Sequence, residues 1–198
     1  MAYTWETHGP FGGHVVLDFV NTVDDALKTR ELNAIPDWPT FLDWSLRVGL
    51  ASGEEAALLA GLGDAQAQAA ELAELWALRE ALYGDLTGLL EEVPGRGLSS
   101  LGAAARWGLG LAVLAPAPST APGWQVGVDT AGLATPRARL GVAVEDLLWR
   151  GDLARLRQCG RCTGLYLDHG RGAGRRWCRM ETCGNRAKAE RHRARRGE

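Results

Sequence analysis

The alternation of apolar and polar residues predicts that the first 150 residues are mostly helical. The clearest helix runs from Asp64 to Glu92, where leucines and aromatic residues recur at helical spacing on one broad face. At about 1.5 Å per residue, this segment of about 28 residues would be about 42 Å long. Shorter helices are predicted after Pro39-Thr40 and Thr135-Pro136, and after Ser99 and Ser100, which can cap a helix. Another is predicted after Ser52, because Ser52-Gly53-Glu54-Glu55 has the S-x-x-E form of a capping box.

Three apolar runs in the same part of the chain have the composition of β-structure. The first, Gly13 to Val20, fits either a buried strand or the apolar lead-in to a helix. The other two, Leu109–Ala115 and Trp124–Asp129, are separated by prolines and a glycine, which predicts a hairpin with a long loop. We therefore expect an α+β domain over residues 1–150 that is mainly helical and contains a small β-sheet.

All four cysteines lie near the end of the chain, at Cys159, Cys162, Cys178 and Cys183. The C-x2-C pair, the fifteen residues after it and the C-x4-C pair have the spacing of a structural site for one Zn²⁺ per chain. Two disulfides would require an oxidising compartment, and a redox C-x-x-C would not need two further cysteines. His169, between the pairs, is another candidate ligand, although an exposed turn histidine is the simpler interpretation.

The residues around the cysteines predict a small second domain over residues 151–198. Leu165–Asp168 and Arg175–Trp177 are predicted to form the strands of a hairpin, with a glycine-rich turn between them. The Ala- and Arg-rich segment after Cys183 has no helix breaker before Gly197, so it is predicted to be a helix. The tight turn (knuckle) at Cys159 and Cys162, the hairpin and a helix that begins at the last ligand would together form a treble-clef-like zinc finger.

The net charge of −2 hides an uneven distribution along the chain. Residues 1–150 contain 9 Lys and Arg against 19 Asp and Glu, a net charge of −10, whereas residues 151–198 contain 13 against 5, a net charge of +8. Such a division predicts an acidic body attached to a contact for nucleic acid or another polyanion. The alternative is that the basic segment docks on the acidic body of the same chain.

The run Cys183-Gly184-Asn185-Arg186 resembles the signature of the CGNR zinc fingers. The similarity extends to Cys159-x2-Cys162, Leu165–Asp168, Arg175-Arg176-Trp177-Cys178-x-Met180 and Lys188. In that family the finger follows an N-terminal domain named ABATE, and residues 17–24 and 78–83 are similar to its opening motif and its central helix. The resemblance implies a bacterial transcription regulator, often linked to stress.

The basic residues of the second domain are candidate nucleic-acid contacts. Around the predicted last helix they leave no apolar stripe for packing, so this helix either contacts a polyanion or lies in solvent. The candidates are Arg175, Arg176, Arg186, Lys188, Arg191, Arg193 and Arg195. Arg175 and Arg176 have a structural alternative, because four thiolates around one zinc ion leave a net negative charge that favours nearby cations.

Asp18, Asn21 and Thr22 place polar side chains at the end of an apolar run. They are candidates for lining a ligand pocket, which would make the N-terminal domain a sensor of a small-molecule effector. The alternative is that they cap a helix and satisfy buried backbone amides.

Together these patterns predict a zinc-dependent nucleic-acid-binding protein, with duplex DNA as its partner. The N-terminal domain would bind a ligand or mediate assembly, including as a homodimer. A protein-interaction adaptor that docks through the finger is the alternative, and an enzyme is the weakest interpretation because no convincing catalytic motif is present. With neither a signal peptide nor an apolar run of about 18 residues, we expect a cytoplasmic protein without membrane contact.

Overall fold

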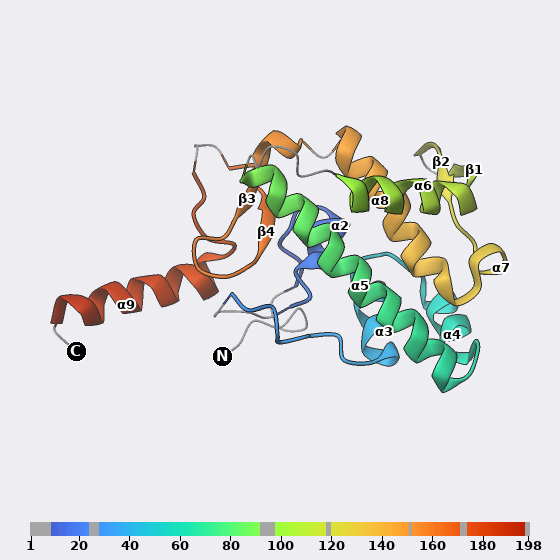
Figure 1. Ribbon diagram of the computed structural model, residues 1–198, viewed down its shortest axis with the longest axis horizontal. Helices are drawn as coiled ribbons and strands as arrows, with labels where there is room; N and C mark the ends of the chain where they lie inside the picture. Colours follow the sequence, from blue (N-terminus) through green and yellow to red (C-terminus); the bar gives the residue numbers. More distant parts are fainter. Residues whose placement is uncertain are drawn as a thin grey trace. The chain divides into compact units, whose positions relative to one another are not determined.

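The computed structural model of the chain describes residues 9–23, 28–91, 98–117, 120–150, 152–170 and 174–196. It is mostly helical and contains two separate two-stranded sheets (Figure 1). The chain divides into two compact units, residues 35–151 and residues 1–34 together with 152–198. We call them the body and the finger unit. The sequence prediction placed all of residues 1–150 in one domain, whereas here residues 1–34 are grouped with the C-terminal segment.

The body is built mainly from helices. They are α3 (Trp38–Arg47), α4 (Gly53–Gly61), α5 (Ala65–Leu90), α6 (Ser99–Leu111), the short α7 (Val128–Ala131) and α8 (Thr135–Arg150). A 3₁₀ turn, Gly132–Ala134, connects α7 to α8. None of the described helices combines the length and the apolar character that crossing a membrane requires.

Side chains accept hydrogen bonds from the first backbone amides of α3, α4, α5 and α6. The predicted capping box of α4 is confirmed: Ser52 Oγ accepts the Glu55 N–H at 3.2 Å, and the Glu55 carboxylate accepts the Ser52 N–H at 2.8 Å. The prediction that the serines at 99 and 100 cap α6 is wrong. Asp85 of α5 does so instead, since its carboxylate accepts the N–H groups of Ser100 and Leu101 at 2.8 and 3.0 Å.

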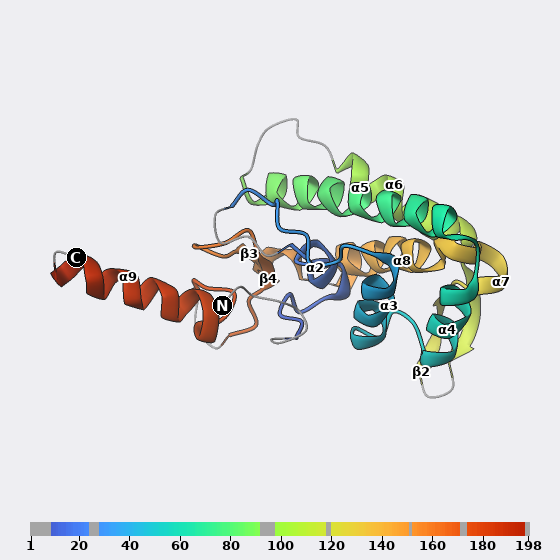
Figure 2. The same ribbon diagram turned by 90° about the horizontal axis from the view of Figure 1, so that it is seen from below.

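The core of the body lies where α5, α6 and α8 pack together, and Figure 2 shows the three helices side by side. Leu75, Leu82 and Leu86 of α5 are fully buried. Helices α6 and α8 cross closely at two glycines. A Cβ at Gly108 would lie 2.5 Å from the Ala138 carbonyl oxygen, and a Cβ at Gly141 would lie 2.4 Å from that of Ala104. A larger residue at either position would force the two helices apart.

The predicted hairpin of the body is confirmed, with different limits. Strand β1 (Val113–Ala117) pairs antiparallel with β2 (Thr120–Gln125), and Leu114 lies opposite Trp124. The first residues of the predicted strand, Leu109–Leu111, are instead the last turn of α6. An apolar run does not by itself distinguish helix from strand, and the packing of α6 on α8 extends the helix through these positions.

In the finger unit, the apolar run near the N-terminus is helical. Helix α2 (Val15–Val20) is capped by His14, whose Nδ1 accepts the Val16 N–H at 3.3 Å. The strand interpretation of Gly13–Val20 is therefore wrong, and the run does not lead into a helix either: it is itself the helix, which ends at Asn21. Four of the six residues of α2 are buried, which explains why the segment is apolar on almost every side.

The C-terminal part of the finger unit contains a small sheet and a long helix. Strand β3 (Leu156–Gln158) pairs antiparallel with β4 (Leu165–Leu167), and a π-helical turn, Met180–Gly184, leads into α9 (Asn185–Arg196). The prediction of a return strand at Arg175–Trp177 is wrong: these residues are irregular, and β3 is the partner of β4.

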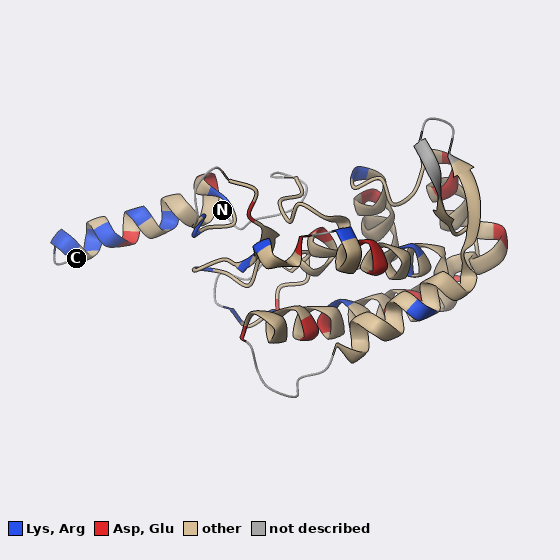
Figure 3. Ribbon diagram, turned by 90° about the horizontal axis from the view of Figure 1, so that it is seen from above, with Lys and Arg blue, Asp and Glu red and all other residues tan. Residues whose placement is uncertain are grey.

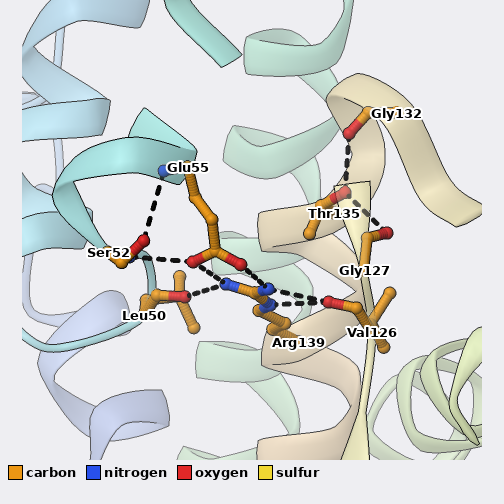
Figure 4. A network of polar contacts seen from close by, with 8 residues as sticks. All are labelled: Leu50, Ser52, Glu55, Val126, Gly127, Gly132, Thr135 and Arg139. Atoms are coloured by element: carbon orange, nitrogen blue, oxygen red, sulfur yellow. Dashed lines mark hydrogen bonds and ion pairs between the residues drawn. The ribbon is translucent and has the colours of Figure 1, made fainter. Parts of the chain in front are cut away.

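A half-buried network around Arg139 joins separate parts of the body (Figure 4). The Arg139 guanidinium pairs with both carboxylate oxygens of Glu55, one of them at 2.9 Å. It also donates to the carbonyl oxygens of Leu50 at 2.8 Å and Val126 at 2.9 Å. One side chain of α8 thus fixes the start of α4 and the segment after β2.

The charge of Glu55 should make the stability of the body depend on pH. Hydrogen bonds from Arg139 lower the pKa of Glu55 from 4.5 to about 2. This stabilisation is therefore complete above about pH 4.5 and is lost as the pH falls toward about 2. We expect Glu55→Gln to lower the free energy of unfolding by about 1–2 kcal/mol at pH 7, and by much less near pH 2. Urea unfolding at both pH values measures the difference.

The control for this experiment is Glu54→Gln, which removes an exposed charge from the same first turn of α4. Both variants keep the four cysteines, so any effect of acid on the finger unit is common to them. If Glu55→Gln destabilised the body equally at both pH values, the ion pair with Arg139 would not be the cause.

Candidate metal centre

Four cysteine sulfur atoms meet in the finger unit. Cys159 follows β3, Cys162 lies in the loop between β3 and β4, Cys178 precedes the π-helical turn and Cys183 lies within it. Their Sγ atoms all lie within 4.8 Å of one another, and those of Cys162 and Cys178 are 3.7 Å apart. A tetrahedron with Zn–S bonds of about 2.3 Å has S···S edges of about 3.8 Å. All four thiols are free, so their arrangement fits one zinc ion and no disulfide.

The electrostatics of the cluster favour a cation. Cys159, Cys178 and Cys183 are buried, and Cys162 is half-buried. The pKa of Cys159 is lowered because the thiols of Cys162 and Cys178 donate hydrogen bonds to it, and the pKa of Cys178 is raised by the same contact. Four thiolates this close would repel one another strongly in a buried site. A divalent ion at their centre removes this repulsion.

Backbone amides support the sulfur atoms. The Cys178 N–H points at Cys159 Sγ at 3.3 Å, and the Gly164 N–H points at Cys162 Sγ at 3.4 Å. His169, the other candidate ligand, is exposed and does not belong to the cluster.

Aromatic and arginine side chains surround the cysteines. Tyr166 of β4 is fully buried against them, and burial raises the pKa of its hydroxyl to about 12. Its hydroxyl donates to the Arg175 carbonyl oxygen, and the Arg175 guanidinium lies 4.4 Å from the centre of the Tyr166 ring. Arg175 also donates to the carbonyl oxygens of Trp177, at 2.9 Å, and Cys178. These contacts give Arg175 a structural role in the chain segment that carries Cys178.

The N-terminal segment completes the centre. The Asn21 side chain forms two hydrogen bonds with the backbone of Leu165: Nδ2 donates to the carbonyl oxygen at 2.7 Å, and Oδ1 accepts the N–H at 2.8 Å. The Leu167 N–H donates to the Gly12 carbonyl oxygen at 2.9 Å. Phe11 packs against the cysteine cluster itself. The two ends of the chain therefore build one unit, which sequence reasoning missed.

The other two residues of the predicted ligand pocket also contact backbone. Asp18 Oδ1 accepts the N–H groups of Phe11 at 2.9 Å and Gly12 at 2.7 Å, while burial raises the pKa of its carboxyl. Thr22 Oγ1 donates to the Phe19 carbonyl oxygen at 2.7 Å. Like the contacts of Asn21, these are the contacts expected if the motif satisfies backbone groups and does not line a pocket. Binding of an effector here stays a prediction.

The structure places most of the candidate nucleic-acid residues on α9, where Figure 3 shows a row of basic positions. Lys188, Arg191, Arg193 and Arg195 are exposed, and Arg186 is half-buried. Of the two candidates outside the helix, Arg175 is held as described above. The Arg176 guanidinium lies 4.8 Å from the centre of the Trp177 ring.

Comparison with protein families agrees with this geometry. Residues 155–196 match the CGNR zinc finger. The match includes all four cysteines of the cluster, β4 and α9, and the residues before 155 lie outside it. No curated protein matches the chain. The finger thus has the ligands and the spacing of a zinc site, and its residues are similar to a family of zinc fingers.

The metal content of the purified chain should be one zinc ion per molecule. Cys183→Ser removes one of four ligands and should lower the zinc content well below one, because three thiolates bind the ion more weakly. Elemental analysis of protein expressed without an affinity tag measures the ratio. Thr182→Ser, at the neighbouring buried position, is the control and should keep its zinc. Full zinc occupancy in Cys183→Ser would contradict the assignment of the four ligands.

Asn21 should contribute to zinc retention although it lies outside the matched finger. Asn21→Ala leaves the Leu165 N–H and carbonyl group without their partners, which costs about 1–3 kcal/mol for a buried polar group. We therefore expect zinc to be transferred to a competing chelator at roughly 5- to 100-fold lower chelator concentration than in the unmodified chain.

The control is Lys188→Ala, which removes an exposed side chain from α9 of the same unit. It should behave as the unmodified chain does. Equal zinc retention by all three proteins would show that the N-terminal segment packs beside the finger without stabilising it.

Proposed function

We propose that this protein is a zinc-dependent DNA-binding transcription regulator of the bacterial cytoplasm, without enzymatic activity. In this proposal the finger is of treble-clef type and contacts DNA, and an ABATE-like N-terminal domain senses a ligand or mediates assembly. The main support is the composition and exposure of α9. Its twelve residues include six Lys and Arg and one acidic residue, and its only buried side chain is that of Ala187.

The one acidic residue of α9 is neutralised within the finger unit. Glu190 forms an ion pair of 2.6 Å with Arg161, which lies between Cys159 and Cys162. The pair joins the first half of the metal centre to the helix. It also leaves no uncompensated negative charge on α9 to repel a phosphate.

Helical geometry separates α9 into two faces. At about 100° per residue, Arg186, Glu190 and Arg193 share one face, and Lys188, Arg191 and Arg195 share the opposite one. The second face borders a shallow hollow to which Asn185 and His192 also contribute. Within the part of the chain that the structure describes, Lys188 and Arg195 form no ion pair. This face is therefore the best candidate for the nucleic-acid contact.

The dimensions of α9 suit duplex DNA. Twelve residues at about 1.5 Å each give a helix of about 18 Å, and a helix of this kind enters a major groove about 12 Å wide. Long basic side chains on the groove side reach phosphates on its walls, and arginine also recognises guanine edges. The protein-interaction adaptor remains the second candidate. It is favoured by Met180, an apolar side chain that is 60% exposed beside the metal centre.

The DNA affinity of the zinc-loaded chain should fall steeply with salt. If about four phosphates are neutralised, log K should decrease with log salt at a slope of about −3.6. Arg195→Ala should weaken binding to every sequence and reduce the magnitude of the slope by about 0.9, because one phosphate contact is lost. Fluorescence anisotropy with a labelled random duplex at several salt concentrations measures both quantities.

Arg47→Ala, which removes an exposed arginine at the end of α3 in the body, serves as the control. It should leave both the affinity and the slope unchanged. If the zinc-loaded chain bound no DNA even at low salt, the adaptor would become the better proposal.

A further inference from the structure

The body contains an unusually long stretch without charge. No Asp, Glu, Lys or Arg occurs between Arg106 and Asp129. Elsewhere the body is strongly acidic: residues 35–151 contain 14 Asp and Glu against 7 Lys and Arg, a net charge of −7. The β1–β2 hairpin lies within the uncharged stretch.

The hairpin exposes large apolar side chains. Leu114 and Trp124 lie directly opposite each other in the register, so they share one face, and they are 62% and 49% exposed. Val113, on the other face, is 59% exposed. We call the pair of Leu114 and Trp124 the hairpin patch. A two-stranded hairpin is marginally stable alone, so one that leaves its largest side chains in water gains from a partner that covers them.

Prolines restrict how a partner can approach. Pro116 within β1 and Pro122 within β2 have no backbone N–H and so weaken pairing of either strand with another chain. Contact through the face of the hairpin is not affected by them. The cross-strand pair of Leu114 and Trp124 offers an aromatic and an aliphatic side chain there, the kind of group that dominates the energetics of protein interfaces.

We propose that the hairpin patch is a homotypic interface, through which two copies of this chain pair about a two-fold axis. The distribution of charge on the body favours a second copy of this chain as the partner. Two bodies of net charge −7 repel each other across most of their surfaces, and the uncharged hairpin is where they approach at the least electrostatic cost. A basic partner would instead be drawn to the acidic surface, because the hairpin offers it no charge.

A two-fold axis makes this surface self-complementary. It places Trp124 of one copy against Leu114 of the other, and the reverse contact forms at the same time. The Leu114–Trp124 pair of each copy is therefore covered by the same pair of the other copy. This pairing rests on the assembly role in the proposed function, but it requires neither zinc nor DNA, so a failure of DNA binding would leave it standing.

Sedimentation equilibrium of the zinc-loaded full chain tests the proposal. We expect the mass to rise from 21.3 kDa toward twice that value as the protein concentration increases. Leu114→Lys and, separately, Trp124→Lys should hold the chain at the monomer mass over the same range, because each places two positive charges in a symmetric contact. Both positions are exposed, so circular dichroism should show unchanged helix content.

The matched control is Leu58→Lys, which makes the same kind of change at an α4 residue that is 54% exposed. It should dimerise as the unmodified chain does. The proposal is overturned if the unmodified chain stays monomeric at all concentrations, if both hairpin variants still dimerise, or if Leu58→Lys abolishes dimerisation as completely as they do.

Discussion

Four sulfur atoms within 4.8 Å of one another are the constraint on which the finger unit depends. As thiolates they repel, and as thiols they compete for the same few hydrogen bonds, so a divalent cation is the partner that satisfies all four. The separation of 3.7 Å between Cys162 and Cys178 is close to the edge of a zinc–thiolate tetrahedron. Strands β3 and β4 have three residues each and the π-helical turn has five, so none of them is stable alone. Binding of structural zinc contributes about 10–16 kcal/mol in small fingers.

The N-terminal segment extends this unit beyond the matched finger. Asn21 pairs with both backbone groups of Leu165, and the carbonyl oxygens of Gly9 and Pro10 accept hydrogen bonds from Arg179 at 2.7 and 2.8 Å. The segment itself also turns tightly before α2. A Cβ at Gly12 would lie 2.6 Å from Leu17 Cβ and 2.9 Å from the Asp18 backbone nitrogen, so only glycine fits there. Residues far apart in the sequence therefore share one small structure around the metal.

Sequence reasoning succeeded where the signal is local. The cysteine spacing identified the cluster, the S-x-x-E pattern identified the cap of α4, and helical periodicity identified α5 to within a few residues. It failed where distant contacts decide the outcome. Asp85 caps α6 from another helix, and the role of Asn21 depends on a partner 144 residues away. Arg175–Trp177 is not a strand because Leu156–Gln158 takes the place beside β4.

We expect zinc to organise both ends of the chain into one unit while the body folds on its own core. Hydrogen exchange of the full chain with zinc bound and after removal of zinc by a chelator tests this most directly. Metal removal should abolish the protection of α2 together with that of β4, whereas α5 and α8 should keep theirs. Unchanged protection of α2 after zinc is lost would contradict it.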